Sequence, residues 1–217
     1  MGRRPGLRIW IMLGAALAVV AAGLFLWWRQ DLRWRPRDID HDQAKIERLV
    51  ESAGWVSPGL TGPKLYMVSF RSCPQCVKFK AEAFPALHAA GVDTRVIEIA
   101  QRDSGELSRS TPQERTTVAE LWINRRWALM QAWEKVPPAA WTAPGLPPAD
   151  GDPVRTAAVE AGRDLVDQLT PLMARNGIGF AYPTLIWWTK DGRMRGCTCE
   201  KPHTLRYVLE ELGAKAD

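Results

Sequence analysis

The first thirty residues contain the longest apolar run of the chain. Residues 9–28 (IWIMLGAALAVVAAGLFLWW) are twenty consecutive uncharged positions. A helix rises about 1.5 Å per residue, so this run can span a hydrocarbon core of about 30 Å. A cleaved signal peptide normally has an apolar core of only about 7–15 residues, and cleavage after Ala22 would leave GLFLWW at the new terminus. We therefore expect residues 1–29 to form a cytoplasmic tip and an uncleaved transmembrane anchor.

The next segment, residues 30–63, is predicted to be a juxtamembrane linker with one short helix. Ile46, Leu49 and Val50 recur at helical spacing between residues 40 and 53, and a glycine follows as a suitable stop. This stretch is too short for a second domain, so we expect a spacer or docking helix.

A strand, a helix and a second strand follow. Residues 64–70 form an apolar run typical of a buried strand. Residues 74–90 predict a helix that Pro85 should kink and Gly91 should end. Residues 92–100 alternate polar and apolar side chains, as a half-buried strand does.

Residues 101–179 are predicted to be a helical insertion. TPQE at residues 111–114 matches a capping box, and apolar residues recur at helical spacing from there to about residue 135. Six prolines between residues 137 and 153 exclude regular structure there. A second helix should run from about residue 153 to 168, and Thr170 with Pro171 should start a short third one.

The last block, residues 180–217, completes the domain. YPTLIWWTKDGRMRGC predicts a strand, a tight turn at Asp191 and Gly192, and another strand, and residues 202–212 predict a closing helix. The order β-α-β, helical insertion, β-β-α predicts an α/β domain over residues 64–217, with a small mixed sheet covered on both faces.

The net charge of +5 does not indicate a nucleic-acid partner. Residues 1–37 hold seven arginines and one aspartate, whereas the rest of the chain holds 22 basic and 23 acidic side chains. The soluble part therefore lacks the basic surface that phosphates require. Arginines flank both sides of the apolar run, and their count alone would place the C-terminal domain in the cytoplasm.

Two of the four cysteines, Cys73 and Cys76, lie three apart between a predicted strand and a predicted helix. A structural bridge, half a zinc site and a redox-active pair all use this spacing. Zinc would need Cys197 and Cys199 as its other ligands, and cysteines separated by one residue are cramped for that. A redox pair is the favoured interpretation, and the other two stay open.

These motifs together resemble the thioredoxin fold. CPQC between a strand and a helix, followed by YPT before a hairpin, is its pattern, and the helical insertion resembles the catalytic domains of the disulfide isomerases DsbC and DsbG. The likeness covers about residues 64–213 and is strongest in SFRSCPQC, ERTTVAELWINRRWALMQAW and NGIGFAYPTLIWWTKDGRMRG. Only residues 30–62 stand in place of the dimerisation domain of DsbC and DsbG, and Met67 stands where thioredoxin has a buried acid.

The resemblance implies a role for each residue of these motifs. Cys73 would be the exposed attacking thiol and Cys76 the buried resolving thiol. A cis-proline facing them would leave neighbouring backbone groups free for an extended substrate. The implied substrate-binding residues are Pro74, Gln75, Tyr182, Pro183 and Thr184, with Pro183 as the cis-proline. We expect no cofactor and no bound metal.

The start of a helix is a suitable place for a reactive cysteine. The positive end of the helix dipole and the nearby side chains of Arg71, Lys78 and Lys80 should lower the pKa of the Cys73 thiol. The thiolate would attack a client disulfide to give a mixed disulfide, which Cys76 would resolve.

Cys197 and Cys199 follow the last predicted strand. Cysteines two apart can form a bridge with some strain, which makes such a bridge easier to reduce. One interpretation is a second redox pair that exchanges with Cys73; a structural bridge or two idle thiols are the others.

The sequence therefore predicts a membrane-anchored thiol–disulfide oxidoreductase or isomerase. It would be a single-pass inner-membrane protein, held through residues 9–28. Its C-terminal domain would lie in the periplasm, because the cysteine chemistry favours an oxidising compartment and outweighs the arginine count. The expected partners are proteins with thiols or disulfides and a membrane redox donor or acceptor, without nucleic acid. The alternative is a non-catalytic thioredoxin-fold interaction module tethered to a membrane assembly.

Overall fold

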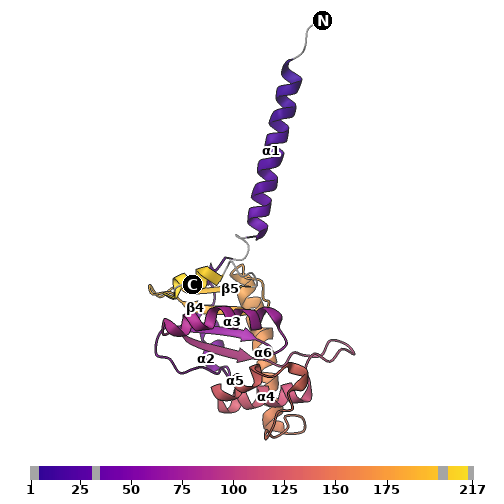
Figure 1. The fold of residues 1–217 in the computed structure, drawn as a ribbon, viewed down its shortest axis with the longest axis vertical. Helices are drawn as coiled ribbons and strands as arrows, with labels where there is room; N and C mark the ends of the chain where they lie inside the picture. Colours follow the sequence, from indigo (N-terminus) through magenta and orange to yellow (C-terminus); the bar gives the residue numbers. More distant parts are fainter. Residues whose placement is uncertain (1–4, 31–34, 200–204, 215–217) are drawn as a thin grey trace. The chain divides into compact units, whose positions relative to one another are not determined.

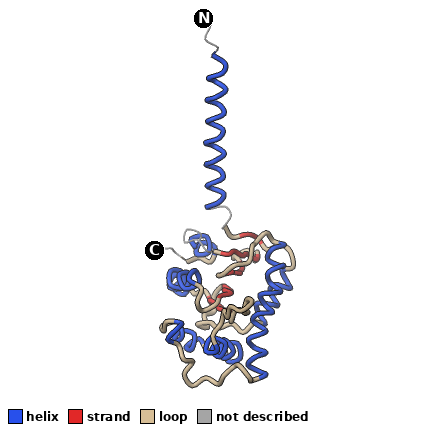
Figure 2. Tube along the Cα trace, turned by 90° about the vertical axis from the view of Figure 1, so that its right-hand side faces the viewer, coloured by secondary structure: helices blue, strands red, loops and turns tan. Residues whose placement is uncertain are grey.

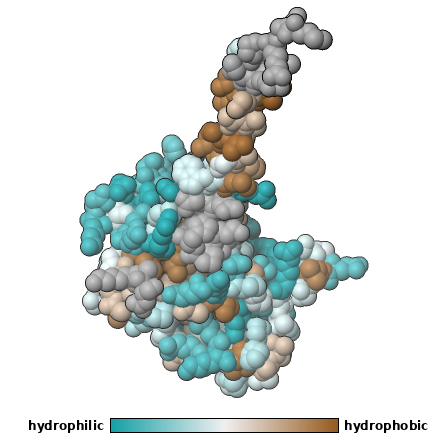
Figure 3. Space-filling model, turned by 45° about the horizontal axis from the view of Figure 1, so that its top comes forward, coloured by the Kyte–Doolittle hydropathy of each residue, from teal (hydrophilic) through white to brown (hydrophobic). Residues whose placement is uncertain are grey.

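The apolar N-terminal run forms one long helix, α1 (Pro5–Gln30), in a unit of its own that comprises residues 1–35. The computed structural model describes residues 5–30, 35–199 and 205–214. Large apolar side chains are exposed along α1, as the brown surface in Figure 3 shows. This helix is long and apolar enough to cross a membrane, and an N-terminal signal sequence has the same properties.

The second unit, residues 36–217, is built on one mixed sheet of five strands in the order β1-β5-β4-β2-β3 (Figure 1). The parallel pair β2 and β3 is joined by a helical crossover, whereas β4 runs antiparallel to both β2 and β5. This thioredoxin-like arrangement confirms the predicted fold class. The strands are β1 (Arg37–Asp38), β2 (Lys64–Ser69), β3 (Asp93–Glu98), β4 (Thr184–Trp188) and β5 (Met194–Thr198).

Helices cover both faces of the sheet, because successive side chains of each strand point to opposite faces (Figure 2). The first core contains Leu65 and Met67 of β2 and lies under α3 (Pro74–Ala89) and α7 (Leu205–Glu211). The second core contains the alternate residues of β2 and lies under α2 (Gln43–Ser52) and α6 (Pro153–Arg175). The expected start of the closing helix at residue 202 lies outside the described residues.

The insertion contains α4 (Pro112–Asn124), α5 (Trp127–Glu134), a short 3₁₀ turn η2 (Pro138–Ala140) and α6. The predicted capping box is confirmed, because the Thr111 side chain accepts the backbone N–H of Glu114. The single helix expected up to residue 135 is wrong, since the chain breaks at Arg125 in a left-handed conformation with φ of 49°. Tertiary contacts hold this break: the Arg125 guanidinium donates to the Ala53 carbonyl at 3.0 Å and stacks on Trp55.

The predicted break before Pro171 is also wrong, because α6 continues through that proline. A proline removes one helical hydrogen bond. Leu169, Leu172 and Met173 around it are all buried in the second core, and burying side chains of this size stabilises by about 1.5–3 kcal/mol each, more than one hydrogen bond contributes.

Residues 36–63 are not the linker that the sequence suggested, since they belong to the same compact unit as the sheet. Strand β1 pairs with β5, and the Asn176 side chain accepts the backbone N–H groups of Asp40 and His41 at 2.8 Å each. The predicted short helix is confirmed as α2, whose Ile46 is fully buried in the second core. This segment therefore supplies an edge strand and part of one helical layer.

Gly54 lies in close contact with Trp122, where this segment meets the insertion. A Cβ atom at Gly54 would lie 2.5 Å from Cγ of the Trp122 ring, and the ring cannot retreat freely because its N–H donates to the Glu98 carbonyl at 2.8 Å. We expect Gly54→Ala to destabilise the fold by about 3 kcal/mol, measured by urea unfolding of the full chain in detergent. Gly179→Ala is the control, because a Cβ there meets nothing within 4 Å; equal stability of the two variants would refute the prediction.

Candidate functional site

The Cys73–Cys76 pair lies at the start of α3, shortly after the end of β2, as the sequence predicted. The two residues form a disulfide with Cα atoms 5.2 Å apart. Cys73 is the N-cap of α3, and its sulfur accepts the backbone N–H of Cys76 at 3.0 Å. Pro74 begins the helix, where the missing N–H of a proline costs no hydrogen bond. An N–H donor aimed at the Cys73 sulfur is an arrangement that stabilises a thiolate there.

The expectation that Cys73 is exposed is wrong for this disulfide-bonded state. Cys73 is 3% exposed and Cys76 is fully buried, because the bridge holds both sulfurs in the first core between the sheet and α3. The neighbouring Ser72, Pro74 and Gln75 are exposed. A reactant can therefore reach the surface next to the bridge, but contact with the sulfur of Cys73 requires a local movement.

The Tyr182–Pro183 peptide bond is cis, as the resemblance implied. Strand β4 begins at the next residue, Thr184, which lies across from Val68 near the end of β2. The cis-proline and the disulfide therefore lie at the same edge of the sheet, namely the one where β2 ends and β4 begins. Pro183 is buried and Tyr182 is half-buried against Phe70, with ring centroids 5.0 Å apart. Burial raises the pKa of Tyr182 to about 12, so this side chain is neutral at physiological pH.

Thr184 does not have the accessible side chain expected of a substrate-binding residue. It is fully buried, and its hydroxyl donates to the Ala181 carbonyl at 2.6 Å. In this position its hydroxyl fixes the turn that carries the cis-proline, and the side chain is not available to a substrate.

Cys197 and Cys199 also form a disulfide, at the end of β5. Cys197 is 2% and Cys199 5% exposed, and both lie in the same core as Cys73 and Cys76. All four sulfurs are thus paired in two bridges on one side of the sheet. Among residues 5–30, 35–199 and 205–214, no group of three or more His, Cys, Asp or Glu side chains is placed to hold a metal ion.

The cationic side chains expected to act on Cys73 have other partners. Arg71 is buried and donates to the carbonyls of Trp133, Glu134 and Val136 at distances of 2.7–3.2 Å. Lys78 lies 3.7 Å from Glu82 on the exposed side of α3. Lys80 is buried and binds two carboxylates. The backbone N–H of Cys76 contacts the Cys73 sulfur directly, whereas the polar contacts of these three cations are with other groups.

A buried charged cluster joins α3, β3 and α5, and it was not predicted from the sequence. Lys80, one helical turn after Cys76, binds Glu98 at 2.7 Å and also contacts Glu134. The Ser69 hydroxyl donates to the same Glu98 oxygen at 2.7 Å. Burial alone would lower the pKa of Lys80, but the two carboxylates outweigh it and raise this pKa. One feature of the sequence could have indicated this cluster: a lysine lies four residues after Cys76, on the buried face of the predicted helix.

A pocket of about 590 Å³ opens between the residues just before Cys73 and the insertion. Its lining includes Arg71, Ser72, Glu114, Trp133 and Trp141. One oxygen of Glu114 is buried without a hydrogen-bond partner. Burial, with a smaller effect of Glu98, raises the pKa of Glu114 from 4.5 to about 7.

The raised pKa of Glu114 predicts a pH dependence of stability. The folded chain holds a proton on this carboxyl that the unfolded chain releases, so the stabilisation is complete below about pH 4.5 and is lost as the pH rises through about 7. We expect Glu114→Gln to remove this loss, which amounts to at most about 3 kcal/mol. Urea midpoints measured from pH 4 to 8 test this. Glu106→Gln, on an exposed loop, is the control, and parallel curves for wild type and Glu114→Gln would contradict the assignment.

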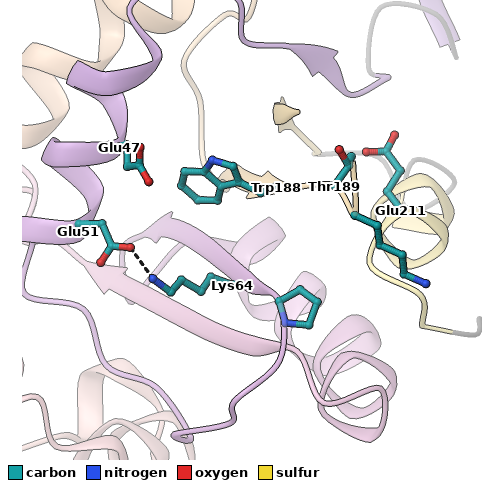
Figure 4. Close-up of a pocket in the computed structure, with 8 residues that line it drawn as sticks. Glu47, Glu51, Lys64, Trp188, Thr189 and Glu211 are labelled. Carbon is teal, nitrogen blue, oxygen red and sulfur yellow. Dashed lines mark hydrogen bonds and ion pairs between the residues drawn. The ribbon is translucent and has the colours of Figure 1, made fainter. Parts of the chain in front are cut away.

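A second pocket, of about 390 Å³, lies at the opposite edge of the sheet, where β2 begins and β4 ends (Figure 4). Trp188 forms one wall, Glu47 and Glu51 approach from α2, and Lys64 pairs with Glu51 at 2.8 Å. No cysteine lines this pocket. The candidate site is therefore the edge that holds the disulfides and the cis-proline.

Comparison with known proteins finds similar solved structures. No protein-family model and no curated protein sequence matches the chain. Among solved structures, BcfH of Salmonella enterica Typhimurium is similar with a TM-score of 0.50 and 16% identity, over 95% of this chain and 93% of that one. ScsC of Proteus mirabilis gives a TM-score of 0.48 and 11% identity over 96% of both chains. DsbG of Mycobacterium tuberculosis gives 0.40 and 15% identity, over 80% of this chain and 94% of that one.

Proposed function

We propose that this chain is a thiol–disulfide oxidoreductase that acts on protein disulfides through Cys73 and Cys76. The observation that carries the proposal is the position of a CPQC disulfide at the start of α3, on the same sheet edge as a cis-proline. An inert bridge would not need an N-cap cysteine whose sulfur accepts the N–H of its partner. This hydrogen bond would stabilise the thiolate that exchange chemistry requires.

Exchange would begin at Cys73. In the reduced protein, the Cys73 thiolate attacks one sulfur of a client disulfide; that bond breaks, and a mixed disulfide forms while the other client sulfur leaves as a thiolate. Cys76 then attacks Cys73, the Cys73–Cys76 bond re-forms, and the client leaves with both thiols reduced. The reverse sequence oxidises a client dithiol. Once the bridge is broken, the Cys73 side chain can turn toward the exposed surface of Ser72, Pro74 and Gln75.

The client would bind as an extended segment beside Tyr182 and Pro183. A cis-proline leaves the backbone groups around it free to bond to an added strand, and the half-buried Tyr182 ring offers an apolar contact at this place. Isomerase activity is part of this proposal. After the Cys73 thiolate has attacked a non-native disulfide of a client, another thiol of the same client can attack the mixed disulfide. This step releases Cys73 and forms a new disulfide in the client.

We further propose that α1 is an uncleaved anchor that holds the thiol domain in the periplasm, with a membrane redox donor or acceptor as partner. An oxidising compartment suits a domain whose four cysteines are all bridged. The length and apolar character of α1 support the anchor.

A non-catalytic interaction module is the second candidate, because Cys73 is only 3% exposed in the bridged state. Insulin reduction and refolding of scrambled ribonuclease by the full chain in detergent separate the two. The enzyme proposal predicts turnover in at least one assay, with the Cys73–Cys76 bridge cycling between states. Absence of turnover in both assays would leave the interaction module as the function.

A further inference from the structure

The Cys197–Cys199 bridge occupies the same layer of the molecule as the Cys73–Cys76 bridge. Met67 on β2, Leu185 on β4 and Cys197 on β5 lie in one row across the sheet, and all three point into the first core. The register also pairs Thr184, the residue after the cis-proline, with Thr198, the residue before Cys199. The second disulfide therefore flanks the sheet edge to which the first one belongs.

Both bridges belong to one continuous buried apolar cluster, together with residues of α3 and α7. All four cysteines are at most 5% exposed. Pro74 and Gln75 beside the first bridge are exposed, whereas Gly196 is buried and Thr198 is half-buried beside the second bridge. A client therefore approaches the first bridge more readily, and a sulfur of that bridge does not need to cross solvent to reach the second one. This placement favours exchange between the two bridges over independent reaction of the second one.

The second bridge lies where the chain leaves the sheet, since β5 ends at Thr198. The Cα atoms of Cys197 and Cys199 are 5.4 Å apart, which is within the usual range for a disulfide. The two bridges are therefore placed at the same end of the sheet, each next to the end of a strand.

We propose that Cys197–Cys199 is a second redox-active disulfide, which takes electrons from the Cys73–Cys76 dithiol so that one chain oxidises two client dithiols. The inference rests on the proposed function of Cys73 and Cys76, and it adds an internal electron acceptor to it.

A client dithiol is oxidised to a disulfide, and its two electrons and two protons pass to Cys73 and Cys76. The Cys73 thiolate attacks the Cys199 sulfur, the Cys197–Cys199 bond breaks, and Cys197 leaves as a thiolate. Cys76 attacks Cys73, the first bridge re-forms, and Cys199 is released, so the two electrons and two protons end on Cys197 and Cys199. A second client dithiol can then react at the restored first bridge.

Counting oxidised client tests this inference on the unmodified protein. The fully oxidised full chain in detergent is mixed with an excess of a synthetic peptide that carries two cysteine thiols, and peptide disulfide is counted. Two equivalents per chain are expected, and one equivalent would overturn the relay. With a single equivalent of peptide, alkylation and mass spectrometry should find Cys197 and Cys199 alkylated and Cys73–Cys76 still bridged. Alkylation of Cys73 and Cys76 instead would overturn it as well.

Two double variants separate this inference from the function on which it rests. Cys197→Ser with Cys199→Ser should oxidise one equivalent; if it oxidises none while folded, the proposed function fails and the relay with it. Cys73→Ser with Cys76→Ser should oxidise none; one equivalent there would mean that the second bridge reacts directly with clients, which contradicts the relay. If a variant does not fold, the alkylation pattern of the unmodified chain still tests the relay.

Discussion

Replacing Cys73 by serine is expected to lower the rate at which the full chain reduces insulin on the order of 10³-fold, because the variant loses the sulfur that forms the mixed disulfide. A serine hydroxyl at the start of α3 can still accept the N–H of Cys76 as an N-cap. The fold should therefore persist, apart from the stability contributed by the bridge. Circular dichroism and the insulin assay on the same sample measure the two effects separately.

Glu82→Gln is the matched control for this prediction. Glu82 lies on the exposed side of α3 and pairs only with Lys78, at 3.7 Å, so its variant should keep the wild-type rate. If Cys73→Ser reduced insulin as fast as this control, Cys73 would not be the attacking thiol.

Lys80→Met is expected to destabilise the fold by about 3–5 kcal/mol, since it leaves the Glu98 carboxylate buried without its cation. Glu98 is 1% exposed, and its remaining side-chain partner would be the Ser69 hydroxyl. Methionine is nearly as long as the apolar part of lysine, so the substitution leaves no large cavity. The loss of stability is therefore due to the missing charge. Urea unfolding of the full chain in detergent, with both bridges intact, measures it.

Two comparisons make the Lys80 result specific. Adding Glu98→Gln to Lys80→Met removes the isolated charge and should recover at least half of the lost stability. Arg102→Met breaks surface ion pairs with Glu160, Asp164 and Asp167, and all four side chains are about 40% exposed or more. Because these pairs are exposed, their loss should cost less than about 1 kcal/mol. If Lys80→Met cost no more than Arg102→Met, the buried cluster would not stabilise the fold.

Local sequence signals predicted the parts of this site that depend on neighbouring residues. CPQC with proline at the first helical position marks the start of α3, and the TPQE capping box marks the start of α4. The cis bond at Pro183 followed from the resemblance of the whole pattern, since the local sequence alone does not favour it.

Features that depend on distant contacts could not be predicted in this way. The two residues of β1 have no recognisable strand pattern, and they form a strand because β5 offers a free edge. Lys80 and Glu98 look like surface residues in the sequence, yet they are buried because each neutralises the other. The burial of Cys73 likewise depends on the packing of two bridges into one core, which the spacing of the cysteines does not show.

Trapping of a client on the Cys76→Ser variant tests the proposed function most directly. Without the resolving thiol, the reduced full chain should accumulate a mixed disulfide with insulin, and peptide mapping by mass spectrometry should place the link on Cys73. If no adduct forms, or if the client is linked only to Cys197 or Cys199, the Cys73–Cys76 pair is not the site of exchange and the proposal is wrong.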